Sequence, residues 1–488
     1  MKNRRFFTKV TAVATAAVIA LSAFGASAFA AGSTPAGYIQ ENVEFETAHA
    51  DLIEYIYQQT MQFQPSINLE NYQFHVSDFE TLCLSLYGTH PDLTVILPNQ
   101  NFYSCSYNPM SGIAANVMPK YAYSREEATQ RLERFYEMAD YFLGFVNDDM
   151  DDFTKALILH DELAIHGEYI ISKQLDDGTT VLSSDYSQMV EGWGRCETYT
   201  EVYAYLLAQN GIRSEIVNSD TMNHEWLKAQ LDGQYYNIDL TWDDPIYDRP
   251  GKVSHNYFLW SDEEFQTESS VKDAHTDYTS AYASGSGYDS YDNLHGFETQ
   301  VCWLNGTLYA IDENAKQLVA YNHLTDGMTP LCDVSGWWSA GNGYYWNGNF
   351  SSLVAYGGLL YYNSPGAVYS YDPVTGETVK VADNEDSNEL YGLRRIDNVL
   401  YGVNAPNPNV TGTLTALYEL PAIEPEPEYT LGDVNNDGEI DIRDATEIQR
   451  YLANYIGFDR AQWLAADFDL DGDVTVADVT AIQRFINR

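Results

Sequence analysis

The stretch from residue 224 to residue 239, HEWLKAQLDGQYYNID, predicts a β-hairpin. Two strand-like runs flank Asp232-Gly233, a dipeptide strongly favoured in two-residue hairpin turns. With that turn, the numbers of directly opposed residues add up to 465, so His224 would face Thr241. Asp239 lies two residues before Thr241, and side chains two apart on a strand share a face. We therefore expect His224 and Asp239 to be diagonal neighbours that can hydrogen-bond.

A helix is expected before this hairpin, over residues 197–210. Apolar residues recur there at helical spacing, and Gly211 is a favourable helix terminator. The residues at that spacing are Val202, Tyr203, Leu206 and Leu207. A helix followed by antiparallel strands predicts an α+β domain.

One of the five cysteines, Cys196, stands where that helix starts. A helix N-terminus presents free N–H groups and lowers the pKa of a thiol, which favours the nucleophilic thiolate. The Cys196 amide can donate a hydrogen bond to an oxyanion, and Gly192 and Gly194 allow close approach to a substrate carbonyl. With His224 as base and Asp239 to orient it, the nucleophilic set is complete. The alternative is a small buried cysteine without a chemical role.

Several blocks of this region resemble the transglutaminase-like superfamily, and they follow in the same order. The blocks are GRCETY at 194–199, HEW at 224–226, YYNIDLTWDD at 235–244, YFLWSD at 257–262 and His275. The resemblance covers roughly residues 150–275. It implies a papain-like α+β core with Cys196 as nucleophile, His224 as base and Asp239 as its orienting group, and no cofactor for catalysis. Glu225 and Glu197-Thr198 depart from the family's usual residues beside the histidine and the cysteine.

Other polar residues near these blocks are weaker candidates. Gln188, eight residues before Cys196, is a candidate second oxyanion donor, as are Trp193 and Tyr186. His160 and His166 are six residues apart on a predicted helix, so they would not bind one metal ion from the same face.

Near the C-terminus, DVNNDGEIDIRD at 433–444 recurs as DFDLDGDVTVAD at 467–478. Oxygen ligands at positions 1, 3, 5, 9 and 12, glycine at position 6 and a backbone carbonyl at position 7 have the spacing of calcium-binding loops. We therefore predict two bound Ca²⁺ ions. The predicted calcium-binding residues are Asp433, Asn435, Asp437, Glu439, Asp441 and Asp444 in the first loop, and Asp467, Asp469, Asp471, Asp473, Thr475 and Asp478 in the second.

Each loop precedes a predicted helix, over 445–452 and 479–486, whereas an ordinary EF-hand also has a helix before its loop. This order resembles a type I dockerin, covering residues 430–488. The resemblance implies docking to a cohesin module of a scaffold protein, through loop positions 10 and 11 and the helix that follows. The implied cohesin-binding residues are Ile442, Arg443, Gln449, Arg450, Val476, Ala477, Gln483 and Arg484.

Residues 292–421 are rich in predicted strands. Three segments, starting at Leu304, Tyr356 and Ile396, repeat a tight turn followed by an aromatic strand, at spacings of 52 and 40 residues. The irregular repeat predicts a partial propeller-like array or a sandwich. Its aromatic residues are expected to be strand cores, and a glycan-binding platform is the alternative.

Composition limits the cellular setting and the partners. Residues 1–30 have a basic start, an apolar stretch and a small-residue cleavage site at Ala28-Phe-Ala30, which predicts a signal peptide and a secreted protein. No later stretch approaches the roughly twenty apolar residues of a membrane span. The net charge of −46, or −50 without residues 1–30, disfavours nucleic acid and anionic membranes as partners.

The remaining cysteines allow two interpretations. Cys83 with Cys105, and Cys302 with Cys332, are close enough in sequence to form two disulfides and leave Cys196 free. Alternatively, all four are free thiols.

The expected architecture is multidomain. It comprises a signal peptide (1–30), a helical lead-in (31–150), a transglutaminase-like core (151–278), a linker (279–291), a β-rich repeat region (292–421), a Pro/Glu linker (422–429) and a dockerin (430–488). The expected function is a secreted cysteine enzyme that acts on peptide or side-chain amide bonds of a protein or peptide substrate. Its dockerin would hold it at the cell surface on a cohesin scaffold, in a cellulosome-like complex. Peptidase and transamidase both remain open. The alternative is a non-catalytic adaptor that binds protein or glycan.

Overall fold

The structure is a computed structural model that describes most of the chain. The described residues are 43–97, 103–175, 178–244, 251–267, 270–271, 273–280, 282–334, 336–347, 350–422, 429–453, 455–469 and 474–486. The predicted signal peptide and most of the Pro/Glu linker lie outside them. The chain divides into two compact units, residues 1–420 and 421–488, and each is described by itself.

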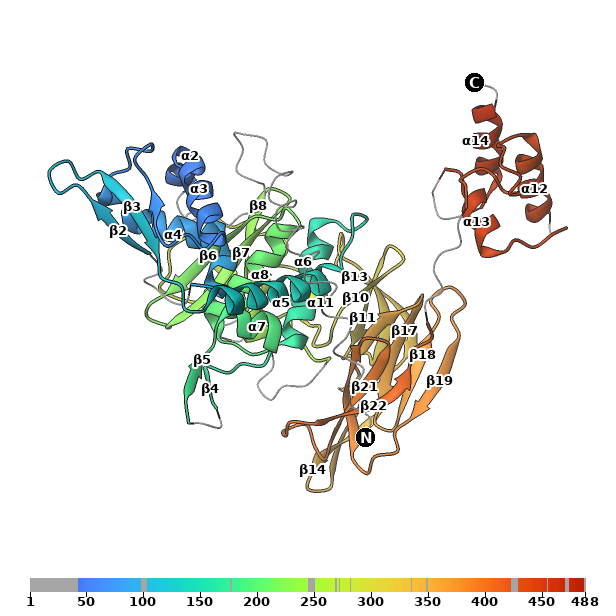
Figure 1. The fold of residues 1–488 in the computed structure, drawn as a ribbon. Coiled ribbons are helices and arrows are strands. Elements are labelled where there is room, and N and C mark those ends of the chain that lie inside the picture. The colour runs from blue at the N-terminus through green and yellow to red at the C-terminus, as the bar shows by residue number, and fades with distance from the viewer. Residues whose placement is uncertain are drawn as a thin grey trace, which may run out of the picture. The chain divides into compact units, whose positions relative to one another are not determined.

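A helix packed on an antiparallel sheet forms the centre of the first unit. The helix is α8 (Cys196–Gln209), and the sheet has the order β6 (Ser214–Ser219), β7 (His224–Leu231), β8 (Gln234–Ile238) and β9 (Phe258–Trp260). Nearly every residue of α8 from Cys196 to Leu207 is buried, because α8 packs on the sheet and on α5, α6 and α7 as well. The predicted α+β core is therefore present (Figure 1).

The hairpin has the predicted register over its paired length. Leu227 lies opposite Ile238, and Leu231 lies opposite Gln234. The β7–β8 ladder stops at the pair of Leu227 and Ile238, because the next residue, Asp239, is the N-cap of the short helix α9 (Leu240–Asp243). The predicted pairing of His224 with Thr241 is wrong: His224 instead lies opposite Ser219 of β6.

The lead-in is not wholly helical as predicted. Its helices are α2 (Val43–Ala48), α3 (Ala50–Met61), α4 (Phe79–Thr89) and α5 (Arg125–Leu143), followed by α6 (Asp152–His166) and α7 (Asp185–Glu191). It also contains a three-stranded sheet with the order β1 (Ile67–Asn68), β3 (Ala114–Pro119) and β2 (Tyr103–Tyr107). A hairpin, β4 (Ser172–Gln174) with β5 (Thr180–Leu182), projects below α7 in Figure 1.

The described part of 279–291 is not the free linker that its composition predicted. Lys228, fully buried on β7, donates hydrogen bonds to Ser280 Oγ at 2.8 Å and to the Tyr282 carbonyl at 2.9 Å. The ring of Tyr282 stacks on Tyr235 at a centroid distance of 4.3 Å. The segment therefore packs on the core, where it supplies two of the partners of the buried ammonium group, and the Asp262 carboxylate supplies a third at 2.8 Å.

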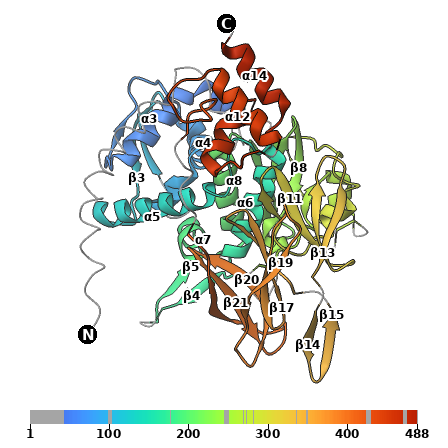
Figure 2. The same cartoon turned by 90° about the vertical axis from the view of Figure 1, so that its right-hand side faces the viewer.

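The β-rich region consists of antiparallel meanders, in which each strand pairs with the next (Figure 2). The first contains β10 (Cys302–Leu304), β11 (Thr307–Asp312), β12 (Gln317–Asn322) and β13 (Gly327–Asp333). A hairpin of β14 (Trp337–Gly341) and β15 (Tyr344–Asn347) follows. The second meander contains β16 (Leu353–Tyr356), β17 (Leu359–Ser364), β18 (Ala367–Tyr371) and β19 (Thr378–Asp383). The third contains β20 (Glu389–Ile396), β21 (Val399–Ala405) and β22 (Thr413–Glu419).

The three echoed sequence segments are the same element of each meander, its first hairpin. One apolar cluster joins the first two meanders through residues such as Leu318 and Leu360, and another joins the second and third through residues such as Tyr361 and Leu393. Consecutive meanders thus pack on one another as propeller blades do. Most aromatic strand residues of the region belong to these two clusters or to two other apolar clusters of the first unit, in keeping with the strand-core interpretation.

The second unit is a three-helix module. It contains α12 (Ile442–Leu452), α13 (Arg460–Ala466) and α14 (Val476–Ile486), and its core includes Ala445, Ile448 and Ile482. Both predicted helices are confirmed, whereas α13 was not predicted.

The predicted disulfides are not formed: Cys83, Cys105, Cys302 and Cys332 are all free thiols, as is Cys196. In the part of the chain that the structure describes, no helix combines the length and apolar character that crossing a membrane requires.

Candidate functional site

Cys196 is the first residue of α8 and is largely buried. Arg195 is the N-cap, and its backbone N–H donates to Thr198 Oγ1 at 3.0 Å, while the Thr198 hydroxyl donates to the Arg195 carbonyl at 3.0 Å. Thr200 Oγ1 donates to the carbonyl of Glu225 at 3.2 Å, which ties the start of α8 to β7. These bonds fix the cysteine beside the strand that carries the predicted base. Glu197, one of the two departures from the family pattern, forms an ion pair with Arg195.

The structure brings the three predicted catalytic residues together. His224 Nε2 lies 2.6 Å from Asp239 Oδ2, and the Cys196 thiol is within hydrogen-bonding reach of the same imidazole. Burial by itself would lower the pKa of His224, but Asp239 and Cys196 outweigh it and raise that pKa to about 10. Burial opposes ionisation of Asp239 too, yet His224 and His275 hold its pKa down at about 2. The geometry therefore favours an imidazolium beside the sulfur, and an imidazolium stabilises a thiolate.

A second histidine, His275, contacts the same carboxylate oxygen. Its Nε2 lies 2.9 Å from Asp239 Oδ2, and its ring stacks on Phe265 at a centroid distance of 3.9 Å. Burial lowers the pKa of His275, so this ring is neutral where His224 is charged. The sequence placed His275 in a family-like block but indicated no role, because a partner 36 residues away leaves no spacing signal.

Gln188 is the predicted oxyanion candidate that the structure supports best. It lies on α7 and is fully buried, and neither polar atom of its side-chain amide has a hydrogen-bond partner among the described residues. A side chain at Gly194 would overlap both Gln188 Oε1 and Thr198 Oγ1. The amide therefore lies against the loop that leads into Cys196. The indole N–H of Trp193, by contrast, is already donated to Glu191 Oε2 at 2.8 Å.

Gly192 is required by its backbone rather than by a substrate. It ends α7 with φ of 71°, in the left-handed region, and a Cβ there would come within 2.6 Å of the His166 carbonyl. His166 in turn accepts from Arg394 of β20 at 3.4 Å and donates to the Met189 carbonyl at 3.1 Å. The β-rich region thus supports, through Arg394 and His166, the loop that precedes Cys196.

The three carboxylates that end the 235–244 block have separate partners. Asp239 forms a hydrogen bond with His224. Asp244 accepts from the Tyr199 hydroxyl of α8 at 2.6 Å. Asp243 accepts from the Tyr257 backbone N–H at 3.0 Å. Asp243 also lies 3.3 Å from His160 Nε2.

His160 belongs to a second buried polar cluster and is not paired with His166. Asp161 Oδ1 lies 2.8 Å from His160 Nδ1 and 2.9 Å from His255 Nε2, and all three side chains are fully buried. Among the described residues of the first unit, this cluster and the cluster of His224, Asp239 and His275 each have possible metal-ligand atoms within 4.8 Å of one another. In both, hydrogen bonds between carboxylate and imidazole account for these short distances.

The first predicted calcium loop folds around two buried carboxylates. Asp433 accepts from the backbone N–H groups of Asp437 at 3.0 Å and Gly438 at 2.8 Å, and Asp444 accepts from those of Asn435 and Asp441. The two carboxylates thereby hold the backbone of the loop, and the oxygen donors of its side chains are of the kind that calcium binds. The described residues of the second loop repeat this: Asp478 accepts from the N–H groups of Asp469 and Thr475.

The ligand sets of the two loops are described to different extents. Asp467, Asp469 and Asp478 have ligand atoms within 4.8 Å of one another. Asp471 and Asp473 lie outside the described residues. In the first loop, the Arg443 guanidinium forms ion pairs with Asp437 and Asp441 at 2.6 and 2.7 Å and with Glu439 at 3.2 Å.

The implied cohesin-binding residues are accessible. Seven of them are exposed and one, Gln483, is half-buried; the exposed ones are Ile442, Arg443, Gln449, Arg450, Val476, Ala477 and Arg484. Ile442 and Val476 are 54% and 70% exposed, so their apolar side chains are available to a partner.

Comparison with known proteins identifies the C-terminal module. The family model of the dockerin type I domain matches residues 431–487. No curated protein matches the chain. Among solved structures, one similar chain is described as the extracellular domain of a hybrid two component system from B. thetaiotaomicron, with 14% identity and a TM-score of 0.17. The match covers 39% of this chain and 27% of that one, so the chain spans about a quarter of its length.

Proposed function

Because the chain ends in a type I dockerin, which indicates attachment to a cohesin scaffold in a cellulosome-like complex, we propose that it delivers a cysteine enzyme to that complex. The enzyme acts on a peptide or side-chain amide bond through Cys196, His224 and Asp239. The observation that carries the proposal is the contact of His224 with both Asp239 Oδ2 and the Cys196 thiol. The extracellular location follows from the same attachment.

The reaction begins with attack of the Cys196 thiolate on the substrate carbonyl carbon. The negative charge that develops on the carbonyl oxygen is stabilised by the Cys196 backbone N–H at the start of α8 and by the side-chain amide of Gln188. A buried amide without a partner has lost its hydrogen bonds to water, so an oxyanion that accepts from it recovers one of them. The His224 imidazolium then protonates the departing amine, and a thioester remains on Cys196.

The second half of the reaction transfers the acyl group from Cys196 to an acceptor. His224, now neutral, accepts a proton from water in a peptidase or from an amine in a transamidase, and the thiolate departs. Asp239 orients the ring throughout and stabilises it when it is charged, and both versions use the same three residues.

The alternative, a non-catalytic adaptor, has one supporting observation in the β-rich region. The hairpin of β14 and β15 exposes Trp337, Tyr344 and Tyr345, at 64%, 73% and 57%. Exposed aromatic rings of this kind can stack on a glycan or a protein. They do not contradict an enzyme, because a binding hairpin and a catalytic core can belong to the same chain.

Alkylation of the thiols tests the proposed nucleophile. We expect iodoacetamide near pH 6 to label Cys196 before any other cysteine, and the labelling to fade in His224→Ala. Burial raises the pKa of the other four thiols, to about 12 for Cys83. Mass spectrometry of the digested protein assigns the label. Labelling of Cys105 or Cys332 at the rate of Cys196, or labelling of Cys196 that His224→Ala leaves unchanged, would contradict the proposal.

A further inference from the structure

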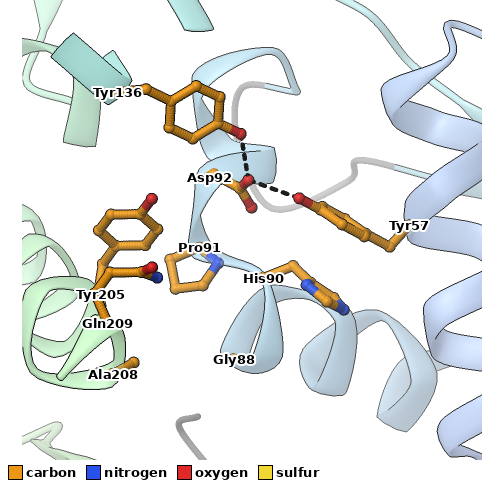
Figure 3. A pocket seen from close by; sticks show the side chains of 9 residues that line it. All are labelled: Tyr57, Gly88, His90, Pro91, Asp92, Tyr136, Tyr205, Ala208 and Gln209. Carbon is orange, nitrogen blue, oxygen red and sulfur yellow. Dashed lines mark hydrogen bonds between the residues drawn. The ribbon is translucent and has the colours of Figure 1, made fainter. Parts of the chain in front are cut away.

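A pocket of about 180 Å³ lies at the opposite end of α8 from Cys196. The helix has 14 residues, so at about 1.5 Å per residue the two ends are roughly 20 Å apart. The pocket is lined by Tyr57, Gly88, His90, Pro91, Asp92, Tyr136, Tyr205, Ala208 and Gln209. These residues come from α3, α4, α5, α8 and the turn after α4, and the proposed reaction uses none of them (Figure 3).

The pocket centres on one buried carboxylate. Asp92 is only 5% exposed, and its Oδ2 accepts from the hydroxyl groups of Tyr57 at 2.9 Å and Tyr136 at 2.6 Å. In Figure 3, its other oxygen is turned away from both hydroxyl groups. Since the two phenols donate their hydrogens to Asp92, they can offer a ligand only oxygen lone pairs. The carboxylate and both phenols therefore act as hydrogen-bond acceptors toward a ligand.

The walls of the pocket are aromatic and carry no positive charge. Rings of Tyr57, Tyr136, Tyr205 and His90 surround the space, and His90 stacks on Tyr57 at a centroid distance of 3.8 Å. Burial lowers the pKa of His90 to about 3, so it is neutral at neutral pH. Neither lysine nor arginine is among the nine lining residues. Aromatic faces beside an anion attract cations.

From this combination we propose that the pocket binds a primary ammonium group, such as that of a lysine side chain or of a small alkylamine. An ammonium ion supplies three N–H donors for the remaining lone pairs of these oxygen atoms and the positive charge that Asp92 and the ring faces attract. At about 30 Å³ per water molecule, the space holds roughly six waters, enough for the head group and a short alkyl chain. The binding site is independent of the proposed amide chemistry.

Calorimetry on the full chain at neutral pH tests this proposal with n-butylammonium and with 1-butanol, a neutral molecule of nearly the same size and shape. We expect saturable binding of butylammonium and at least about tenfold weaker binding of butanol, because only the cation carries a charge that the carboxylate attracts. Asp92→Asn keeps the shape of the site and should weaken butylammonium binding by a similar factor. Equal binding of the alcohol and the ammonium, or no saturable binding of butylammonium, would overturn the proposal.

Gln209 provides charge variants that do not depend on the buried carboxylate. It is exposed at the rim of the pocket, so its substitution should leave the fold intact. Gln209→Lys should weaken butylammonium binding by about two- to fivefold and Gln209→Glu should strengthen it by a similar factor, with both effects reduced by salt. If both Gln209 variants bind butylammonium with unchanged affinity, the proposal of a site that selects a positive charge is overturned, even where Asp92→Asn does not fold.

A third probe distinguishes the two sources of the ammonium group. Nα-acetyl-lysine methylamide presents the side chain as a polypeptide does. Tighter binding of this compound than of butylammonium would assign the pocket to a lysine of a protein partner, and the reverse order to a free amine. Both orders support the ammonium site.

Discussion

At the scale of single residues, the candidate site is organised around one carboxylate oxygen, Oδ2 of Asp239. Asp239 Oδ2 receives both His224 and His275, whereas the neighbouring Asp243 and Asp244 are used to hold α6 and α8. The hairpin predicted the pairing of His224 with Asp239, although Asp239 reaches the histidine from the N-cap of α9 and not from the predicted position in the strand ladder. The hairpin was not enough for His275, Asp243 or Asp244, because their partners come from segments whose approach only the packed core determines.

His275→Gln should lower the rate of amide cleavage or transfer while Cys196 stays reactive. A hydrogen bond to a charged group contributes about 1.5–3 kcal/mol, so losing the one from His275 predicts a roughly 10- to 100-fold lower kcat. As a positioning residue, His275 should affect kcat more than KM and should shift the acidic limb of the pH–rate profile. Asp239→Ala sets the upper limit, with a loss of about 10²–10⁴-fold. A His275→Gln enzyme with the wild-type pH profile would show that the second histidine only fills space.

The ion pair of His224 with Asp239 should make stability depend on pH in a defined window. The folded pKa of His224, about 10, lies above its ordinary value of about 6.5, so its contribution is fully present below pH ~6.5 and is lost as the pH rises through 10. The folded pKa of Asp239, about 2, lies below the ordinary ~3.9, so its contribution is present above pH ~4 and is lost as the pH falls through 2. Urea unfolding of Asp239→Asn and of the wild type should therefore differ most between about pH 4 and 6.5. The exposed Asp140→Asn is the matched control and should show no such window.

At the scale of elements, the sequence predicted the helices and strands whose sequence patterns lie within a short stretch of the chain. Helix α8, the 224–238 hairpin and the two dockerin helices followed from spacing, turn residues and loop motifs within short windows. The sheet of β1, β2 and β3 was not predicted, because strand β1 has two residues and pairs with β3 about fifty residues later. The segment 279–291 was taken for a linker on its Ser/Gly content, whereas the buried Lys228 holds its described part against the core.

Gly194→Ala tests whether the turn between α7 and α8 positions the site. An added Cβ would overlap Gln188 Oε1 and Thr198 Oγ1, so the cap of α8 and the oxyanion amide must shift. We expect a loss of about 1–3 kcal/mol in the free energy of unfolding and a lower kcat, measured by urea denaturation and steady-state kinetics. Gly366→Ala, where an added Cβ meets nothing within 4 Å, is the control and should change stability by less than about 0.5 kcal/mol. Equal behaviour of the two variants would show that the turn tolerates a side chain.

At the scale of the whole molecule, the chain combines two units that are stabilised differently. The first unit has a large apolar core that extends from Leu52 to Tyr321, across the domain of α8 and its sheet and into the first meander. The second has a core of a few small and aliphatic residues and two acidic loops. Stability of the first should not depend on a cation, whereas that of the second should.

Removal of calcium should unfold the dockerin and leave the first unit intact. Without a cation, the carboxylates of each loop repel one another, and a module of about sixty residues buries little apolar surface to offset that repulsion. We expect EDTA to abolish binding of the full chain to a cohesin in calorimetry and to remove the helical signal of isolated residues 430–488 in circular dichroism. Iodoacetamide labelling of Cys196 should be unchanged by EDTA, because none of the calcium-loop residues belongs to the first unit. Cohesin binding that persists in EDTA, or a helical signal that does not need calcium, would show that the Arg443 guanidinium beside Asp437 and Asp441 suffices to hold the first loop without a metal ion.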